Sequence, residues 1–202
     1  MKDINLKETL LNPIFKGNPI SVLVLGICSS LAVTVQLKGA CVMALSVTIV
    51  TALSSLVVSL LRNTIPNRIR IIVQLVVVAM MVILVDQVLK AFAYPVSKTL
   101  SVYIGLIITN CIVMGRIEAF ALGNKPIPSL LDGLANGFGY GLILVIVAFF
   151  RELLGSGTIF GLQVLPAGYV PNNLVILPPF ALILLGCIIW VHRACDKDLQ
   201  EK

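Results

Sequence analysis

The sequence predicts an all-α polytopic membrane protein with six transmembrane helices, arranged as two inverted three-helix repeats. Three observations lead to this prediction: the composition, a series of apolar spans, and a similar layout in the two halves of the chain. The 202 residues are 58% hydrophobic and 12% charged, and their mean hydropathy is +1.05. A soluble domain carries about 25% charged residues. The net charge of +6 comes from basic residues at span ends, where they meet lipid headgroups, so we expect no nucleic acid as a partner.

A polar segment, residues 1–18, precedes the apolar spans. Its leucines recur at helical spacing, which predicts a short interfacial helix on the cytoplasmic side. The six spans cover about 19–36, 39–61, 69–89, 100–115, 133–150 and 175–191. A straight span needs roughly 20 residues. The first and fourth are shorter and contain small or polar residues, so we expect these two helices to be short or broken.

Lysines and arginines are distributed unevenly around the spans. With six spans, both termini and the second and fourth loops share one side of the membrane. That side holds 11 of the 15 basic residues: Lys2, Lys7, Lys16, Arg62, Arg68, Arg70, Arg116, Lys125, Arg193, Lys197 and Lys202. The positive-inside rule therefore predicts that both termini are cytoplasmic.

The two halves of the chain resemble each other in layout. Residues 19–98 form the first expected repeat, and residues 99–202 form the second together with a cytoplasmic tail. Each repeat opens with a short span that carries one cysteine, Cys28 or Cys111. Because each repeat has an odd number of spans, the second repeat crosses the membrane in the opposite orientation to the first. In proteins with such inverted repeats, the functional sites lie near the membrane midplane, at broken helices in equivalent positions of the two repeats. The axis that relates the repeats would bring these two cysteines together.

Polar residues interrupt the fourth span just before and after Cys111. Thr109 and Asn110 need hydrogen-bond partners in hydrocarbon, and Arg116 needs a counter-charge or an aqueous edge. Glu118 follows closely. Polar groups inside a span indicate a functional site by default, but they also serve simply to bond neighbouring helices. We treat these four residues as candidates for supporting roles around Cys111.

The thiols themselves allow two interpretations. None of the five cysteines forms a C-x-x-C pair. A [2Fe–2S] cluster takes four protein ligands, usually cysteines. If Cys28 and Cys111 ligate a cluster, two further ligands must come from another chain, and a paralogue built in the same way is the expected donor. In the alternative interpretation both are small buried packing residues, which is the ordinary role of a free cysteine. We expect that role for Cys41, Cys187 and Cys195.

Four blocks of sequence are similar to one known family. They are Leu25–Thr34, Arg62–Asn67 with Arg70–Gln74, Thr109–Arg116 with Glu118–Ala121, and Phe149–Gly157. Over nearly its whole length the chain resembles the NqrD/RnfE family. This family comprises the D subunits of the bacterial Na⁺-translocating NADH:quinone oxidoreductases and the equivalent subunits of Rnf complexes. The block around Arg62–Gln74 favours the quinone reductase branch.

The resemblance implies a fold and a function. Family members are six-helix subunits of a six-subunit complex in the bacterial inner membrane, where each lies beside a homologous six-helix E subunit of opposite orientation. Each of these two subunits contributes two cysteines to a [2Fe–2S] cluster, and on this chain those positions are Cys28 and Cys111. NADH, FAD, FMN, riboflavin and quinone are handled mainly by other subunits. The implied activity is that of a translocase in which electron transfer through the membrane drives Na⁺ export, with no catalysis by this chain alone.

Three alternatives remain open at this stage. The first is the equivalent subunit of an Rnf ion-translocating ferredoxin:NAD oxidoreductase. The second is a stand-alone secondary transporter, which an inverted repeat also suits; such a protein would work without partner subunits and bind no iron. The third is a structural scaffold, in which serine at Cys28 or Cys111 would leave electron transfer intact.

Overall fold

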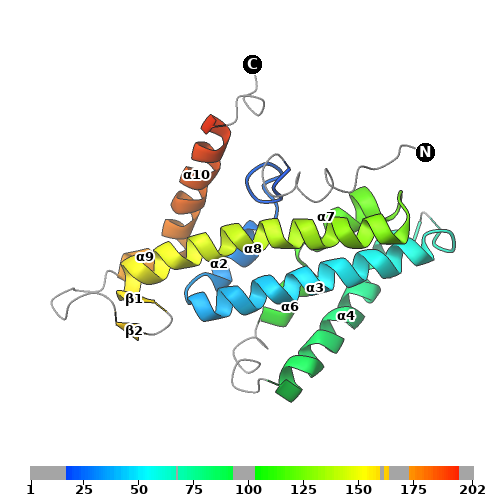
Figure 1. Cartoon of the computed structure of the whole chain (residues 1–202), viewed down its shortest axis with the longest axis horizontal. Helices are drawn as coiled ribbons and strands as arrows, with labels where there is room; N and C mark the ends of the chain where they lie inside the picture. Colours follow the sequence, from blue (N-terminus) through cyan, green and yellow to red (C-terminus); the bar gives the residue numbers. More distant parts are fainter. Residues whose placement is uncertain (1–16, 67, 93–102, 160–161, 164–172, 196–202) are drawn as a thin grey trace.

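The computed structural model describes residues 17–66, 68–92, 103–159, 162–163 and 173–195 (Figure 1). Within these residues the chain consists of helices, two short strands, and connecting turns. The helices are α2 (Ile27–Val33), α3 (Leu37–Leu61), α4 (Arg70–Phe92), α6 (Ile104–Ile108), α7 (Cys111–Arg116), the π-helical turn η2 (Ile117–Ala121), α8 (Pro126–Ser156), α9 (Asn173–Ile176) and α10 (Pro178–Cys195). Strand β1 (Thr158–Ile159) pairs antiparallel with β2 (Leu162–Gln163). The expected interfacial helix in residues 1–18 lies almost wholly outside the described residues.

Two long helices, α3 and α8, form the centre of the molecule and run side by side (Figure 1). Glycines of α8 meet residues of α3 in reverse order, so the two helices are antiparallel. The pairs are Gly133 with Ala52, Gly137 with Thr48, and Gly141 with Ala44. Small residues at such a contact let two backbones approach closely, which is a common way to pack helices within a membrane.

The ends of α8 follow from its local sequence. The helix begins at Pro126, whose fixed φ and missing N–H suit a first helical turn. It ends before Gly157, which has a φ of 66°, a left-handed conformation that glycine adopts without strain. The predicted start at residue 133 was too late. Ser129 and Asp132, which precede the predicted start, belong to the helix and are buried.

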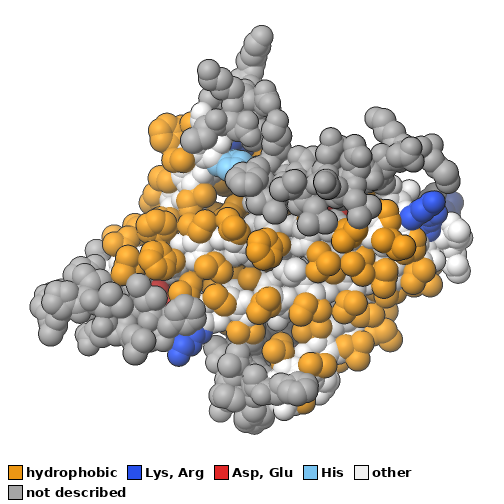
Figure 2. Space-filling view, viewed as in Figure 1, with side chains coloured by type: hydrophobic (Ala, Val, Ile, Leu, Met, Phe, Trp, Pro, Cys, Tyr) orange, Lys and Arg blue, Asp and Glu red, His pale blue; other side chains and the backbone are white. Residues whose placement is uncertain are grey.

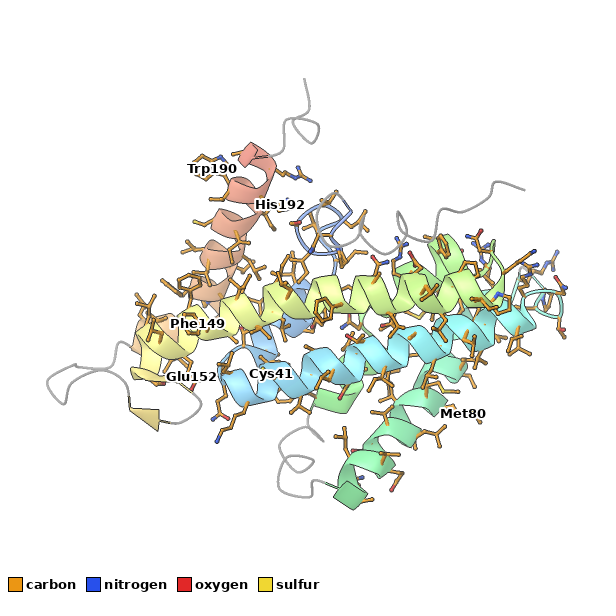
Figure 3. All side chains as sticks on the ribbon, viewed as in Figure 1. Cys41, Met80, Phe149, Glu152, Trp190 and His192 are labelled. Atoms are coloured by element: carbon orange, nitrogen blue, oxygen red, sulfur yellow. The ribbon has the colours of Figure 1, made fainter. Side chains whose placement is uncertain are left out.

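Helices α4 and α10 diverge from the central pair near its opposite ends (Figure 1). Both carry large apolar side chains on their outer surfaces, including Met80, which is 61% exposed, and Trp190, which is 72% exposed (Figure 3). Apolar side chains also cover much of the described face of the molecule, with basic side chains near its edges (Figure 2). Apolar exposure on this scale is typical of a surface that meets lipid or other subunits.

The sixth span is not continuous. We expected one helix over residues 175–191, but α9 ends at Ile176 and α10 begins at Pro178. The reason is local, because Pro178 has no N–H and disfavours a helical backbone at the residue before it. Among the described residues, three helices are long and apolar enough to cross a membrane: Leu37–Leu61, Arg70–Ala91 and Pro126–Ser156. The apolar helix Pro178–Ala194 is shorter.

The first and fourth spans are interrupted, as we expected. In the first, only Ile27–Val33 forms a helix, and turns precede it. In the fourth, Thr109 and Asn110 separate α6 from α7. An apolar helical protein with membrane-spanning segments is therefore what the structure supports. The arrangement of six helices in two inverted repeats, with limits at 19–98 and 99–202, stays a prediction.

Candidate functional site

Both helix breaks come directly before the two cysteines singled out from the sequence. Gly26 has a φ of 77° and precedes α2, in which Cys28 is the second residue. Asn110 has an extended backbone and precedes α7, in which Cys111 is the first residue. The Oδ1 of Asn110 accepts a hydrogen bond from the N–H of Ile112 at 3.0 Å, a common cap that starts a helix. Each cysteine thus lies in the first turn of a short helix, which follows turns in the case of α2 and the end of α6 in the case of α7.

The two breaks are in contact with each other. A Cβ built on Gly26 would lie 2.6 Å from the Cδ1 of Ile112 and 3.3 Å from the Cε2 of Tyr140. A larger residue at position 26 would therefore require the Ile112 side chain to move, and it would also be strained by the positive φ of 77°. Gly26, the residue before α2, thus packs on the first turn of α7, although the two are more than 80 residues apart in the chain.

Hydrogen bonds around Ser29 join the same two segments. The Oγ of Ser29 donates to the carbonyl oxygen of Gly26 at 2.9 Å. It accepts from the hydroxyl of Tyr140 at 2.8 Å and from the Nδ2 of Asn110 at 3.5 Å. Ser29, Asn110 and Tyr140 are fully buried. Sequence reasoning missed Ser29 and Tyr140, although a tyrosine hydroxyl inside an apolar span requires a partner and could have indicated the site.

Cys28 and Cys111 are both exposed on the surface of this chain. Neither fills its core, whereas Cys41 is half-buried on α3 (Figure 3). Cys187, for which we expected a buried packing role, is exposed. The side chain of Cys195 lies outside the described residues. Two accessible sulfurs on adjoining segments suit an iron–sulfur cluster, whose usual ligands are cysteines.

Two sulfurs are half of the ligands that such a cluster needs. Within the described ranges, no group of three or more His, Cys, Asp or Glu residues is placed to hold a metal ion. A [2Fe–2S] cluster takes four protein ligands. If Cys28 and Cys111 are two of them, the others have to come from beyond the described part of the chain.

Arg116 has the counter-charge that its position demands. Its Nε donates to the Oδ2 of Asp132 at 3.0 Å, and its Nη2 pairs with the Oδ1 of the same carboxylate. The guanidinium also lies over the ring of Phe120, 5.8 Å from its centroid. Asn136, one turn further along α8, donates to Asp132 at 3.1 Å. The sequence indicated that Arg116 needed a partner but did not identify Asp132, because the pair forms between α7 and α8 only in the folded chain.

The side chains of Thr109 and Glu118 do not bond to the cysteine-bearing segment of α2, as that of Asn110 does. Thr109 is exposed, and its hydroxyl donates to the carbonyl oxygen of Gly105 in its own helix at 3.0 Å. Glu118 contacts α4: its Oε2 accepts from the Nε2 of Gln74 at 2.8 Å, and its Oε1 pairs with the Nη2 of Arg70 at 2.5 Å. Of the four candidates for supporting roles, Asn110 is the one whose side chain joins the two cysteine-bearing segments.

Arg151 ties the far end of α2 to α8 and α9. Its guanidinium is buried and donates to oxygen atoms at the ends of both short helices. The acceptors are Leu31 O at 3.2 Å, Thr34 Oγ1 at 2.5 Å, Val175 O at 3.5 Å and Ile176 O at 2.5 Å. The last carbonyls of a helix have no partner within that helix. Arg151 therefore anchors the short helix that carries Cys28.

Glu152 performs a similar task at the start of α3. Its Oε2 accepts a hydrogen bond from the backbone N–H of Leu37 at 2.6 Å. The first N–H groups of a helix lack internal partners, and a negative charge near them is favourable. The consecutive residues Arg151 and Glu152 thus join the end of α8 to three other helices (Figure 3).

Comparison with known proteins covers nearly the full chain. A family model described as "Rnf-Nqr subunit, membrane protein" matches residues 6–189. The D subunit of the Na(+)-translocating NADH-quinone reductase of Aeromonas hydrophila is 58% identical over 98% of this chain and 97% of its own length, and the protein of that name from Aeromonas salmonicida gives the same values. The protein of that name from Pseudomonas paraeruginosa is 54% identical over 97% of this chain and 90% of its own length.

Proposed function

Because this chain belongs to the Rnf-Nqr family of membrane-protein subunits, we propose that it is an electron-carrying membrane subunit of a Na⁺-translocating NADH:quinone reductase. Its relatives, at 54–58% identity, carry the name of the D subunit of that enzyme. Those names favour the quinone reductase over an Rnf complex. As a subunit of a translocase, the chain would act within the assembled complex rather than alone, in the inner membrane and with both termini cytoplasmic.

Cys28 and Cys111 would hold one half of a [2Fe–2S] cluster. The single observation that carries this proposal is the contact between the two helix breaks, which brings Gly26 against Ile112 and thereby the two cysteine-bearing turns into one unit. Both thiols are exposed on the chain, so sulfurs of another subunit can reach the same place. When bound, a [2Fe–2S] cluster accepts and donates one electron. The role of this chain is to hold two sulfurs at fixed positions inside the membrane.

We propose a homologous subunit of opposite orientation as the partner, and the internal symmetry of α3 and α8 is the reason. Residues 44, 48 and 52 of α3 lie 89 positions before residues 133, 137 and 141 of α8, and the same offset separates Arg62 from Arg151. A two-fold axis between α3 and α8 would exchange the contact of Gly133 with Ala52 for that of Gly141 with Ala44. This pattern is expected of an inverted repeat. A paralogue built in the same way would offer two equivalent sulfurs.

The proposed link to Na⁺ export concerns the two three-helix repeats. Charge is felt strongly in a medium of low dielectric constant, so reduction next to Cys28 and Cys111 would bias the two repeats between inward- and outward-facing states. We propose that this shift, in the assembled complex, is coupled to Na⁺ movement. NADH, FAD, FMN, riboflavin and quinone would be bound mainly by other subunits.

The test is iron content and electron paramagnetic resonance on the purified complex. Cys28→Ser and Cys111→Ser should each remove one [2Fe–2S] signal and the corresponding iron, while the flavins of the other subunits are retained. Cys41→Ser and Cys187→Ser are matched controls and should leave the signal unchanged. If Cys28→Ser and Cys111→Ser assemble with full iron and an unaltered spectrum, the thiols are not ligands. A stand-alone transporter would show no iron in the unsubstituted protein and would work without the other subunits.

A further inference from the structure

We propose that Tyr140 positions the two ligand thiols, acting through Ser29 and Asn110. This inference rests on the proposed function, because it assigns a role toward the cluster that Cys28 and Cys111 would hold. Ser29 directly follows Cys28, and Asn110 directly precedes Cys111. The hydroxyl of Ser29 accepts hydrogen bonds from both Tyr140 and Asn110. One buried oxygen atom thus connects the two ligand segments to the long helix α8.

The hydrogen bonds of Ser29 leave it no alternative orientation. A serine hydroxyl has one donor and two acceptor positions. In Ser29 the donor is used by the carbonyl oxygen of Gly26 at 2.9 Å, and the acceptors by Tyr140 at 2.8 Å and Asn110 at 3.5 Å. Rotation of the Ser29 side chain would break all three bonds at once. The bonds to Gly26 and Tyr140 are short, the bond from Asn110 is long, and in a fully buried site the loss of all three is costly, so this orientation of Ser29 is favoured.

Tyr140 is the fixed point of this arrangement. It belongs to α8, on which Gly137 and Gly141, the residues three before and one after it, pack against α3. Its side chain is fully buried, and its ring lies against Gly26, where a Cβ would come within 3.3 Å of the Cε2 atom. A tyrosine hydroxyl in an apolar interior needs a partner. Here that partner is the residue next to a proposed ligand, not a backbone carbonyl of α8.

The consequence concerns the separation of the two sulfurs. The segments of Cys28 and Cys111 come from distant parts of the chain, and each follows a helix break that could hinge. The hydrogen bonds through Ser29 hold the two segments at one distance and angle. Outer groups that orient metal ligands typically change metal affinity by about 10–100-fold when removed. We therefore expect the loss of the Tyr140 hydroxyl to weaken retention of the cluster and alter its electronic properties.

The test uses the purified complex with Tyr140→Phe and Ser29→Ala. Tyr140→Phe removes one oxygen atom and keeps the ring that packs on Gly26. Tyr103→Phe removes a tyrosine hydroxyl outside this network, and Thr51→Val removes a buried hydroxyl of α3 that bonds the carbonyl oxygen of Val47; both are controls. Three readouts are compared: the paramagnetic resonance spectrum, the midpoint potential, and the rate at which an iron chelator removes iron.

We expect Tyr140→Phe and Ser29→Ala to change the spectrum and the midpoint potential, and to speed iron removal about 10-fold or more, with both controls like the unsubstituted complex. If both variants leave the spectrum, the midpoint potential and the rate of iron removal unaltered, Tyr140 has no positioning role. This conclusion would hold even if Cys111→Ser abolishes the signal and so supports the proposed ligands. A signal that survives Cys111→Ser would overturn the proposed ligands as well, so the two failures are distinguishable. If the complex with Tyr140→Phe fails to assemble, the same three readouts are compared between Ser29→Ala and the two controls.

Discussion

Gly137 of α8 lies directly against Thr48 of α3, so closely that a Cβ on Gly137 would come within 2.6 Å of the Cα of Thr48. The obstacle is backbone, which cannot rotate away as a side chain can. Gly133 and Gly141 make similar contacts one turn before and one turn after. Helices α2 and α7, which carry the two cysteines, both pack against α3 and α8.

Gly137→Ala should separate α3 from α8 and destabilise the protein. Forcing extra atoms into a packed contact costs about 1–3 kcal/mol. The matched control is Gly186→Ala on α10, where a Cβ would meet nothing within 4 Å and where alanine favours the helix by up to about 1 kcal/mol. Thermal unfolding of the purified complex measures both. Equal melting temperatures for the two variants would contradict the close contact.

Arg116 and Asp132 should behave as a coupled pair. Removing one partner of a fully buried ion pair costs about 3–5 kcal/mol, because the other charge is left without compensation, whereas replacing both by apolar residues is often neutral. Asp132 is buried and Arg116 is 18% exposed at its side chain, so we expect a smaller cost of the same kind. We expect Arg116→Met and Asp132→Leu each to lower the yield and melting temperature of the complex, and the double variant to recover much of the loss. A double variant whose loss equals the sum of the single losses would show that the two side chains do not interact.

Arg151→Lys should destabilise the end of α8 although it keeps the charge. A lysine ammonium cannot reproduce the fork with which Arg151 reaches oxygen atoms of both α2 and α9. Each buried carbonyl left without a donor costs about 1–3 kcal/mol. Arg62→Lys at the end of α3 is the control, and we expect its effect to stay within about 0.5 kcal/mol. Thermal unfolding of the two variants decides the matter, since similar melting temperatures would mean that Arg151 does not anchor α2.

Gln74 should matter more than Arg70 for the docking of α4, although both contact Glu118. Gln74 is buried and its bond to the carboxylate is 2.8 Å long, and a hydrogen bond to a charged group contributes about 1.5–3 kcal/mol. Arg70 is 43% exposed at its side chain, and exposed pairs contribute about 0–1 kcal/mol. Gln74→Met should therefore lower the melting temperature more than Arg70→Met. The reverse order would show that the ion pair holds α4.

The sequence predicted the apolar helices well where the apolar pattern is long and uninterrupted. The spans expected over residues 39–61 and 69–89 correspond to α3 and α4 within a few residues. The predicted span began at residue 133 because it followed the apolar pattern, whereas the first turns of α8 include the polar residues Ser129 and Asp132, which are buried by tertiary contacts. The sixth span broke at Leu177 because the preference imposed by Pro178 outweighed the apolar pattern.

The candidate site was predictable in part, because local breaks depend on residue type whereas side-chain partners depend on tertiary packing. Gly26 and the polar pair Thr109 and Asn110 predicted that the spans carrying Cys28 and Cys111 are short or broken, but the positions of the cysteines in the first turns of α2 and α7 are seen only in the structure. The same holds for the partners of the polar residues. Ser29 lies 81 residues from Asn110 and 111 from Tyr140, and Asp132 lies on a different helix from Arg116, so the pairing depends on how α2, α7 and α8 pack. Thr109, by contrast, turned out to bond only within its own helix.

The most direct measurement is an experimental map of the intact complex, prepared with its full iron content, at a resolution that separates side-chain sulfurs. We predict strong density between the sulfurs of Cys28 and Cys111, joined from the opposite side by two sulfurs of a homologous subunit of inverted orientation. Sulfurs that face lipid, or that have no heavy density and no second polypeptide's sulfurs beside them, would contradict a shared cluster.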